Sequence, residues 1–403
     1  MSTKLRKLNI LIISFIFLSF FLEGNIILFI VLAEIAFQIQ KISNIKKRFF
    51  LILGYIFLLM VVFAMLKYYN STIIYLPLGY SVFSFSAISY LIDNEKSFSR
   101  RLDSYCYLFF IPKFFAGPII RIKDFASQLN EPYLIKKDCL YKCLKVFIFA
   151  SFCKFVLADS FYSVDCDTSL GINGILNAIV YGIAFYIDFY AYSLFAIAAA
   201  IPFGIRLPMN FDSPYLSTSF HEFWKRWNIT LSSWLKDYIY IPLGGNRKGL
   251  IRKYLNIIVV LLISALWHGL SIPFIIWGLA HSILLIIERW KDRVPSSLYT
   301  MWVFLTSCFL WQLFRVDSFN DLVSIIERCF SYYNISLYNT LFCLFSVLIM
   351  FGIETKAIKR LVFSTNDNST SFIYREVLVM SIMLTLTILL PRSINFNFFY
   401  FRF

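Results

Sequence analysis

The fold of this chain is decided by one stretch of its sequence, residues 254–288, which reads YLNIIVVLLISALWHGLSIPFIIWGLAHSILLIIE. Its only acidic residue is Glu288 at the end, and it contains neither Lys nor Arg. A membrane-spanning helix needs about 20 largely apolar residues, so this stretch is too long for one straight span. Gly269 and Pro273 interrupt it. We therefore expect a bent pair of membrane helices that break at that point.

Apolar stretches of similar character recur from one end of the chain to the other. Hydrophobic residues make up 59% of the chain and charged residues 15%, whereas soluble domains are about half apolar and a quarter charged. The mean hydropathy is +0.71. These values predict an all-α polytopic membrane protein, folded as a single domain over residues 1–403. We expect about eleven membrane helices, near 8–22, 26–40, 49–66, 73–91, 105–119, 139–158, 172–200, 254–288, 299–314, 337–354 and 376–391.

Residues 201–253 interrupt the pattern of apolar spans. They contain no apolar window of membrane-spanning length, yet their sequence is helical in character and dense in Trp. Semi-polar, Trp-rich helices of this kind are typical of amphipathic or re-entrant segments at the membrane boundary. We expect such helices here.

Basic residues cluster beside the first apolar runs. Lys4, Arg6 and Lys7 precede the first run, and no small-residue cleavage site follows it, so we expect a retained first span. Further basic clusters lie at 41–48 and 96–101. If each early span crosses once, all three clusters fall on one side, and the positive-inside rule places that side in the cytoplasm. The formal net charge of +15 thus has an explanation that needs no nucleic-acid partner.

The 8 cysteines are not arranged as a recognisable site. Cys139 and Cys143 stand four residues apart on an apolar helix, and the chain has no pair of CxxC motifs. We interpret the cysteines as small apolar packing residues, and we expect neither a metal site nor a disulfide framework.

Three histidines are the main candidates for chemistry. His268 lies inside the stretch quoted above, and an ionisable residue at membrane depth is a candidate functional residue by default. A neutral His can act as a general base, but a helix-packing His bonded to a carbonyl explains the pattern equally well. His281 lies thirteen positions further on, so the two do not share a helix face, and packing is the favoured interpretation for it.

A second group of candidates lies in the semi-polar region. Trp224 or Lys225 and then Asn228 follow His221 at spacings of three, four and seven residues, which puts them on one face if the segment is a single helix. An interfacial helix with anchoring Trp residues and snorkelling cations is the stronger interpretation of this pattern by itself. Asp188, inside another apolar run, is expected either to orient a His or to form a buried pair. The chain has no nucleophile-elbow, P-loop or GxGxxG pattern.

Taken in order, several segments resemble the membrane-bound O-acyltransferase (MBOAT) family, within its bacterial branch of alginate O-acetyltransferase-like and teichoic-acid D-alanyltransferase-like proteins. Each segment alone is a weak signal, but the ordered set is strong. The segments are LPLGYSVFSFSAISYLID (76–93), FAGPIIR (115–121), DFYAYS (188–193), FGIRLPMNF (203–211), FWKRWNITLSSWLKDYIYIPLGGNR (223–247), LWHG (266–269), WGLAH (277–281) and LFRVDS (313–318).

The resemblance implies that His268 is the catalytic base and that tilted helices surround a pore-like core with funnels from both membrane faces. The family's second His usually follows Arg-Trp, and here that position is Asn228. An amide cannot take a proton at ordinary pH. We favour the interpretation that the second His is not the base. The alternatives are that His221 partly replaces it or that this protein is impaired.

By resemblance, the reaction is transfer of an acyl group to a hydroxyl of an exported polysaccharide. The donor is expected to be a cytoplasmic thioester, acetyl-CoA or an acyl carrier protein, with no covalently bound cofactor. Acetyl is the first choice of acyl group and D-alanyl the second, and an extracytoplasmic acetyltransferase partner is implied. The expected substrate-binding residues are His221, Trp224, Trp227, Arg226 and Asp188, beside His268 and Asn228 as catalytic residues.

Two other functions fit the composition. A transporter or flippase for a lipid-linked glycan would also need many spans and aromatic residues. A membrane glycosyltransferase would usually need a carboxylate in a large extracytoplasmic loop, and no such loop is evident. Arg206, Lys225, Arg226 and Arg247 would suit phosphates of a donor, or serve equally well as interfacial cations.

Overall fold

The computed structural model describes residues 3–68, 77–93, 100–163, 172–288, 295–316, 318–330, 337–364 and 370–390. Within these ranges the regular secondary structure is all helical, without a strand, and the predicted all-α class is confirmed. The chain separates into two compact units, the first of residues 1–144 and 195–208 and the second of residues 145–194 and 209–403. That they form a single domain with a pore-like core stays a prediction.

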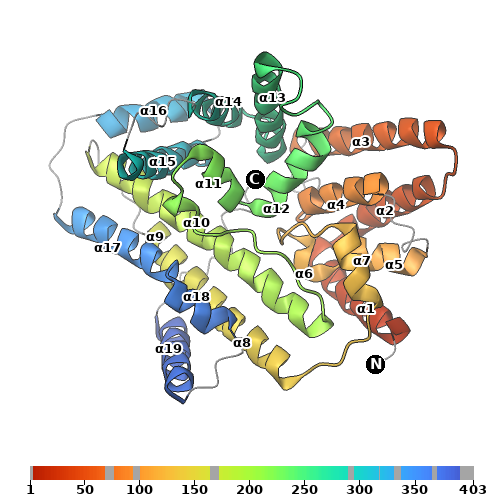
Figure 1. Cartoon of the computed structure of the whole chain (residues 1–403), viewed down its shortest axis with the longest axis horizontal. Helices are drawn as coiled ribbons and strands as arrows, with labels where there is room; N and C mark the ends of the chain where they lie inside the picture. The colour runs from red at the N-terminus through yellow and green to blue at the C-terminus, as the bar shows by residue number, and fades with distance from the viewer. Residues whose placement is uncertain are drawn as a thin grey trace. The chain divides into compact units, whose positions relative to one another are not determined.

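The first unit holds the N-terminal helices, in red to yellow in Figure 1. Aromatic rings fill its interior: Phe29 packs edge-to-face on Phe83 and on Phe114, with centroids 5.1 Å apart in both pairs. Gly79 has a φ of +85°, and a Cβ there would lie 2.7 Å from the Phe114 ring, so only glycine suits the position. The helices are Thr3–Leu22 (α1), Ile26–Gln40 (α2), Ile45–Tyr68 (α3), Tyr80–Asp93 (α4), Arg101–Leu108 (α5), Ile111–Phe114 (α6), Ile122–Asn130 (α7) and the first half of Lys137–Ser151 (α8).

The second unit contains the remaining helices, and Figure 1 shows α11 beside α14 within it. A π-helix, Phe152–Ala158, continues α8. The other elements are Asp159–Ser163 (α9), most of Ile172–Ala200 (α10), Phe220–Arg226 (α11), Ile229–Leu235 (α12), the π-helix Lys236–Tyr240 (η6), Leu250–His268 (α13), Ile272–Ile287 (α14), Ser296–Leu310 (α15), the 3-10 helix Trp311–Phe314 (η8), Phe319–Phe330 (α16), Leu337–Ile353 (α17), Lys356–Phe363 (α18) and Thr370–Leu389 (α19).

The expected count of about eleven membrane helices is not confirmed. Among the described residues, six helical segments are long and apolar enough to cross a membrane, or seven if the bent pair α17–α18 is one span. The chain is therefore a multi-pass membrane protein, and its described residues contain fewer continuous spans than its apolar stretches suggest. The six are Thr3–Gln40, Ile45–Lys67, Gly174–Phe203, Leu250–His268, Ser296–Phe314 and Phe372–Leu389.

The missing spans have local causes. The expected spans 8–22 and 26–40 are joined through a 3-10 turn at Glu23–Asn25 into one helical segment. The expected span 105–119 breaks after Leu108, because Pro112 starts a new, four-residue helix. The expected span 73–91 shortens to the 14 residues of α4. Residues 73–76 and 391 of the expected spans, and Lys96, lie outside the described residues.

Candidate active site

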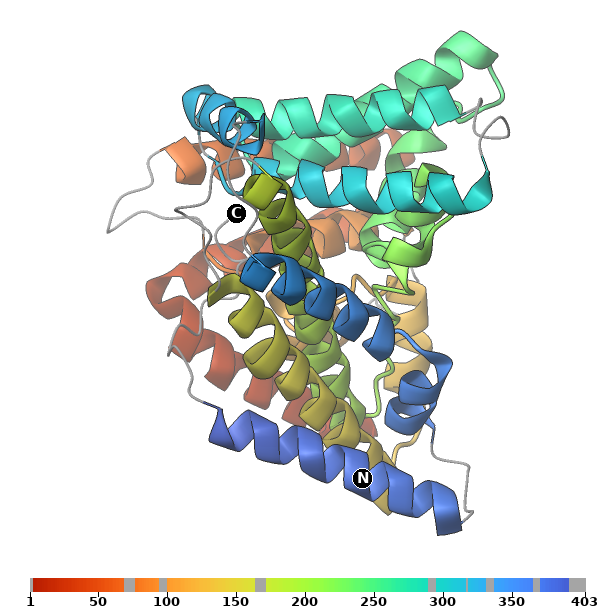
Figure 2. The same ribbon diagram turned by 90° about the vertical axis from the view of Figure 1, so that its left-hand side faces the viewer.

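The α13–α14 hairpin places His268 at a helix end. α13 ends at His268, and α14 begins at Ile272 with Pro273 in its first turn, so the predicted break at Gly269 and Pro273 is confirmed. Figure 2 shows the two helices lying side by side. Gly278 permits this close packing, since a Cβ there would lie 2.9 Å from the Ala265 Cβ. The hairpin brings the Trp277 ring edge-to-face against His268, at 5.7 Å and 84°.

The α11–α12 corner places Asn228. Ser219 caps α11 by accepting the Glu222 N–H, and the helix ends at Arg226. Asn228 then adopts a left-handed conformation, with φ 41° and ψ 55°, which Asn tolerates better than most residues. The N–H of Ile229 donates to the Asn210 carbonyl at 2.8 Å and fixes the corner. Because α11 ends before Asn228, the prediction of one helix face shared by His221, Trp224 and Asn228 is wrong.

His268 and Asn228 line the same small cavity. Its volume is about 20 Å³, which is room for about one water molecule. Trp227 stacks over Trp311 at 4.5 Å and 25° and closes one wall. The cavity thus combines an imidazole and an amide inside a shell of aromatic rings. The lining residues are Phe185, Phe189, Trp224, Trp227, Asn228, Leu231, Ser264, His268, Trp277, Trp311 and Phe314.

A second, larger cavity adjoins the first. Its volume is about 140 Å³, and it shares Trp224, Leu231 and Ser264 with the His268 cavity. Its walls are mostly apolar, and Lys236 and Tyr240 of η6 are among its polar lining residues, with Ser232 and Ser264. Burial raises the pKa of Tyr240, so its hydroxyl remains a hydrogen-bond donor at neutral pH.

Four of the predicted site residues, His268, Asn228, Trp224 and Trp227, line the same cavity. His221 does not: its side chain is 48% exposed and its Nδ1 pairs with Glu288. Because His221 is absent from the lining, its proposed role as a substitute second His gains no support from the structure.

Arg226 and Asp188 also lie outside the cavity lining. Arg226 pairs with Glu222 at 2.7 Å on the surface of α11. Asp188 is buried and pairs with Lys154 at 2.8 Å. That is the buried pair which the sequence offered as one interpretation. Asp188 lies between Phe185 and Phe189 on α10, whose rings do line the cavity.

Sequence reasoning missed Trp277, Trp311 and Phe314 as cavity residues. Trp277 had one usable signal, because it stands four residues before His281 in the decisive stretch. His281 itself is fully buried against Trp224 and Trp277, at 5.0 and 5.1 Å, in line with a packing role. Within the described ranges, no group of three or more His, Cys, Asp or Glu residues could hold a metal ion.

The elements that build this cavity lie mostly in a segment with a family match. A model described as "MBOAT, membrane-bound O-acyltransferase family" matches residues 100–302, half of the chain. The chain belongs to the membrane-bound O-acyltransferase family. This MBOAT segment includes both His268 and Asn228, and α15 to α19 lie largely beyond it.

Curated relatives of this MBOAT chain carry related names. "Probable alginate O-acetylase AlgI" of Pseudomonas aeruginosa is 34% identical over 278 residues, covering 65% of this chain and 53% of the relative. "Peptidoglycan O-acetyltransferase" of Helicobacter pylori is 32% identical over 309 residues, covering 65% and 58%. "Teichoic acid D-alanyltransferase" of Streptococcus thermophilus is 30% identical over 254 residues, covering 55% and 61%. The chain spans about half the length of the first of these relatives.

Proposed function

We propose that this protein is a membrane O-acyltransferase that acylates hydroxyl groups of an exported cell-surface polysaccharide. The observation that carries the proposal is that His268 and Asn228, from two separately formed corners of the chain, line one small cavity. Membership of the MBOAT family and the names of the relatives point to the same chemistry.

The proposed reaction is direct transfer from a thioester. Neutral His268 accepts the proton of the acceptor hydroxyl as its oxygen attacks the thioester carbonyl carbon. The new C–O bond forms while the carbonyl electron pair moves onto the carbonyl oxygen. When that pair returns, the C–S bond breaks, and the leaving thiolate takes the proton from His268. Asn228, which donates and accepts hydrogen bonds but does not titrate, positions the acceptor.

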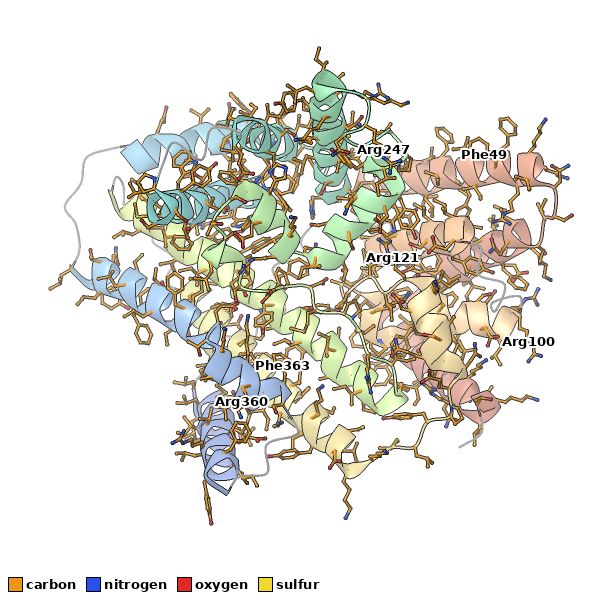
Figure 3. The ribbon with its side chains drawn as sticks, viewed as in Figure 1. Phe49, Arg100, Arg121, Arg247, Arg360 and Phe363 are labelled. Atoms are coloured by element: carbon orange, nitrogen blue, oxygen red, sulfur yellow. The ribbon has the colours of Figure 1, made fainter. Side chains whose placement is uncertain are left out.

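The second cavity suits the arm of the donor. Its apolar walls lead from the residues shared with the His268 cavity to Lys236 and Tyr240. Exposed cations lie on the adjoining turn and the start of α13, including Arg247 (Figure 3), Lys248 and Arg252. A long, uncharged arm that ends in phosphate, as in acetyl-CoA or an acyl carrier protein, matches this arrangement. The arm enters from the cytoplasm, because the positive-inside rule places these cations there.

The protein lies in a bacterial inner membrane with a cytoplasmic N-terminus, and the glycan acceptor approaches from the other face. Acetyl is the preferred acyl group, since O-acetyl relatives share 34% and 32% identity against 30% for the D-alanyl relative. An extracytoplasmic acetyltransferase that completes delivery to the glycan is the proposed partner.

The test is mass spectrometry of surface glycans from cells that lack the gene and carry either the wild-type or the His268→Ala protein. We expect glycan acetyl esters to return with the wild type and not with His268→Ala, at equal protein levels in the membrane. Return of the esters with His268→Ala would remove His268 as the base. A glycan transporter would instead show lost export on deletion, and export restored by both proteins.

A further inference from the structure

Trp277 presents an unexplained polar group at the candidate active site. Its side chain is 1% exposed and lines the His268 cavity. Its indole Nε1–H is buried and has no hydrogen-bond partner among the described residues. Buried donors in native proteins are nearly always paired, because an unpaired one forfeits its hydration without a replacement. A donor left unpaired at the wall of a reaction cavity is therefore a candidate ligand contact.

A second indole shares these properties. Trp224 lines both cavities, and its Nε1–H is likewise buried and unpaired within the described part of the chain. The two rings pack edge-to-face at 5.7 Å and 82°. Trp311 also lines the cavity, and its Nε1–H is likewise buried without a hydrogen-bond partner among the described residues. Trp224 of α11 and Trp277 of α14, whose rings touch each other, are thus two lining residues of one small cavity that each carry an unpaired indole donor.

Surrounding contacts hold Trp277 in place. Its ring is edge-to-face with His268 on the neighbouring helix and with His281 one turn further along α14. The adjacent Gly278 leaves no room for a Cβ beside Ala265, so the backbone at Trp277 is pressed against α13. A donor fixed in this way needs no rearrangement when negative charge develops next to it, which is the property that makes an oxyanion site effective.

We propose that the indole N–H groups of Trp277 and Trp224 donate hydrogen bonds to the acyl carbonyl oxygen during transfer. This inference rests on the proposed acyltransferase function. As the acceptor oxygen forms its bond to the carbonyl carbon, the carbonyl electron pair becomes an oxyanion, and the two N–H groups stabilise it. When the C–S bond breaks, the pair returns and the thiolate leaves with the proton held by His268. No further reactant is needed.

The experiment removes one indole N–H group at a time and keeps the rest of the side chain. Trp277 is substituted by benzothienylalanine, in which sulfur takes the place of the indole N–H while the bicyclic ring is kept. Acetyl transfer is measured in membranes, with acetyl-CoA as donor and an oligomannuronate as acceptor. We expect kcat to fall by about 100-fold with little change in the KM for acetyl-CoA. The same substitution at Trp224 is expected to act in the same direction.

The control is the same substitution at Trp234, a buried tryptophan of α12 that lines neither of the two cavities. It should leave kcat and KM unchanged, while the melting temperatures of the Trp277 and Trp224 variants stay at the wild-type value. Wild-type kcat for the Trp277 variant, or a rise in KM alone, would overturn the inference. Activity in His268→Ala, or none in the wild type, would instead count against the proposed function on which it rests.

Discussion

Two regions next to α10 in the second unit, the Lys154 cluster and the His268 cavity, both bury polar side chains. The cluster pairs them with opposite charges, and the cavity leaves some of them unpaired. Lys154 is 1% exposed and bonds both Asp188 and Asp159 at 2.8 Å, so its charge is met on both sides. At the His268 cavity, which Phe185 and Phe189 of α10 line, the indole N–H of Trp277 is buried and has no partner among the residues that the structure describes. Paired groups of the first kind hold a fold together, whereas unpaired groups at a cavity are available for a substrate.

The largest expected effect comes from breaking the paired region. Asp188→Asn removes one of two counter-charges from buried Lys154, and we expect a loss of about 3 kcal/mol of stability, because a buried charge loses a partner. The measurement is thermal unfolding of the purified protein in nanodiscs, with acyl transfer per folded molecule measured beside it.

The matched control is the triple variant Lys154→Met, Asp188→Leu and Asp159→Asn, which removes all three charges of the cluster and should recover most of that stability. If Asp188→Asn instead kept wild-type stability and lost transfer activity, Asp188 would belong to the reaction, and the comparison would fail.

Asn228 is expected to show the next largest effect, and on activity. Asn228→Gly removes the amide but suits the left-handed backbone, so we expect about a ten-fold loss of transfer with unchanged melting temperature. Asn228→Ala should lose the same activity and in addition about 1 kcal/mol of stability. Kinetic assays in membranes and unfolding curves separate the two.

Asn228→His sharpens this prediction, since His is the residue that the family resemblance leads one to expect here and also tolerates the left-handed region. Because His also forms hydrogen bonds, we expect Asn228→His to keep at least half of the wild-type activity, unlike Asn228→Gly. Full activity in Asn228→Gly would show that the side chain does not contribute.

Glu288 is expected to matter for stability and little for chemistry. Its carboxylate accepts the backbone N–H groups of Phe220 and His221 and pairs with the His221 ring, which caps the start of α11. Glu288→Ala should therefore cost about 1 kcal/mol of stability, and Glu288→Gln, which keeps an acceptor, should cost less. Since Glu288 holds only the start of α11, transfer activity should change less than about three-fold. Lost activity at unchanged stability would place His221 in the reaction.

The smallest effect is expected at the basic turn before α13. Arg247→Ala combined with Lys248→Ala should raise the KM for acetyl-CoA a few-fold, a change worth about 1 kcal/mol or less that disappears at high salt. Arg360→Ala on α18, an exposed arginine elsewhere in the unit (Figure 3), is the control and should not change KM. A salt-independent change would argue against charge recognition.

Parts of this picture could be predicted from the sequence. The hairpin break was readable because Gly269 and Pro273 are strong local signals, and His268 stood out because it is ionisable within an apolar stretch. The all-α class followed from composition. Asn228 was a candidate both through a helical spacing that the structure contradicts and through the family resemblance, and Trp227 was a candidate through the resemblance.

Other parts depend on tertiary contacts that no local pattern records. The end of α11 at Arg226 depends on the corner that Asn210 and Ile229 form together. Trp311 and Phe314 line the cavity from a 3-10 turn whose sequence resembles the end of any apolar span. The count of spans failed because hydropathy does not separate a crossing helix from short buried helices such as α4, α5 and α6.

The most direct test of the central claim compares His268→Ala with Asp188→Asn in the same membranes. Acetyl transfer from acetyl-CoA and thermal unfolding are measured for both. The account predicts that His268→Ala lowers transfer by about 100-fold or more at wild-type stability, whereas Asp188→Asn unfolds earlier but transfers normally while folded. Wild-type transfer by His268→Ala would contradict it.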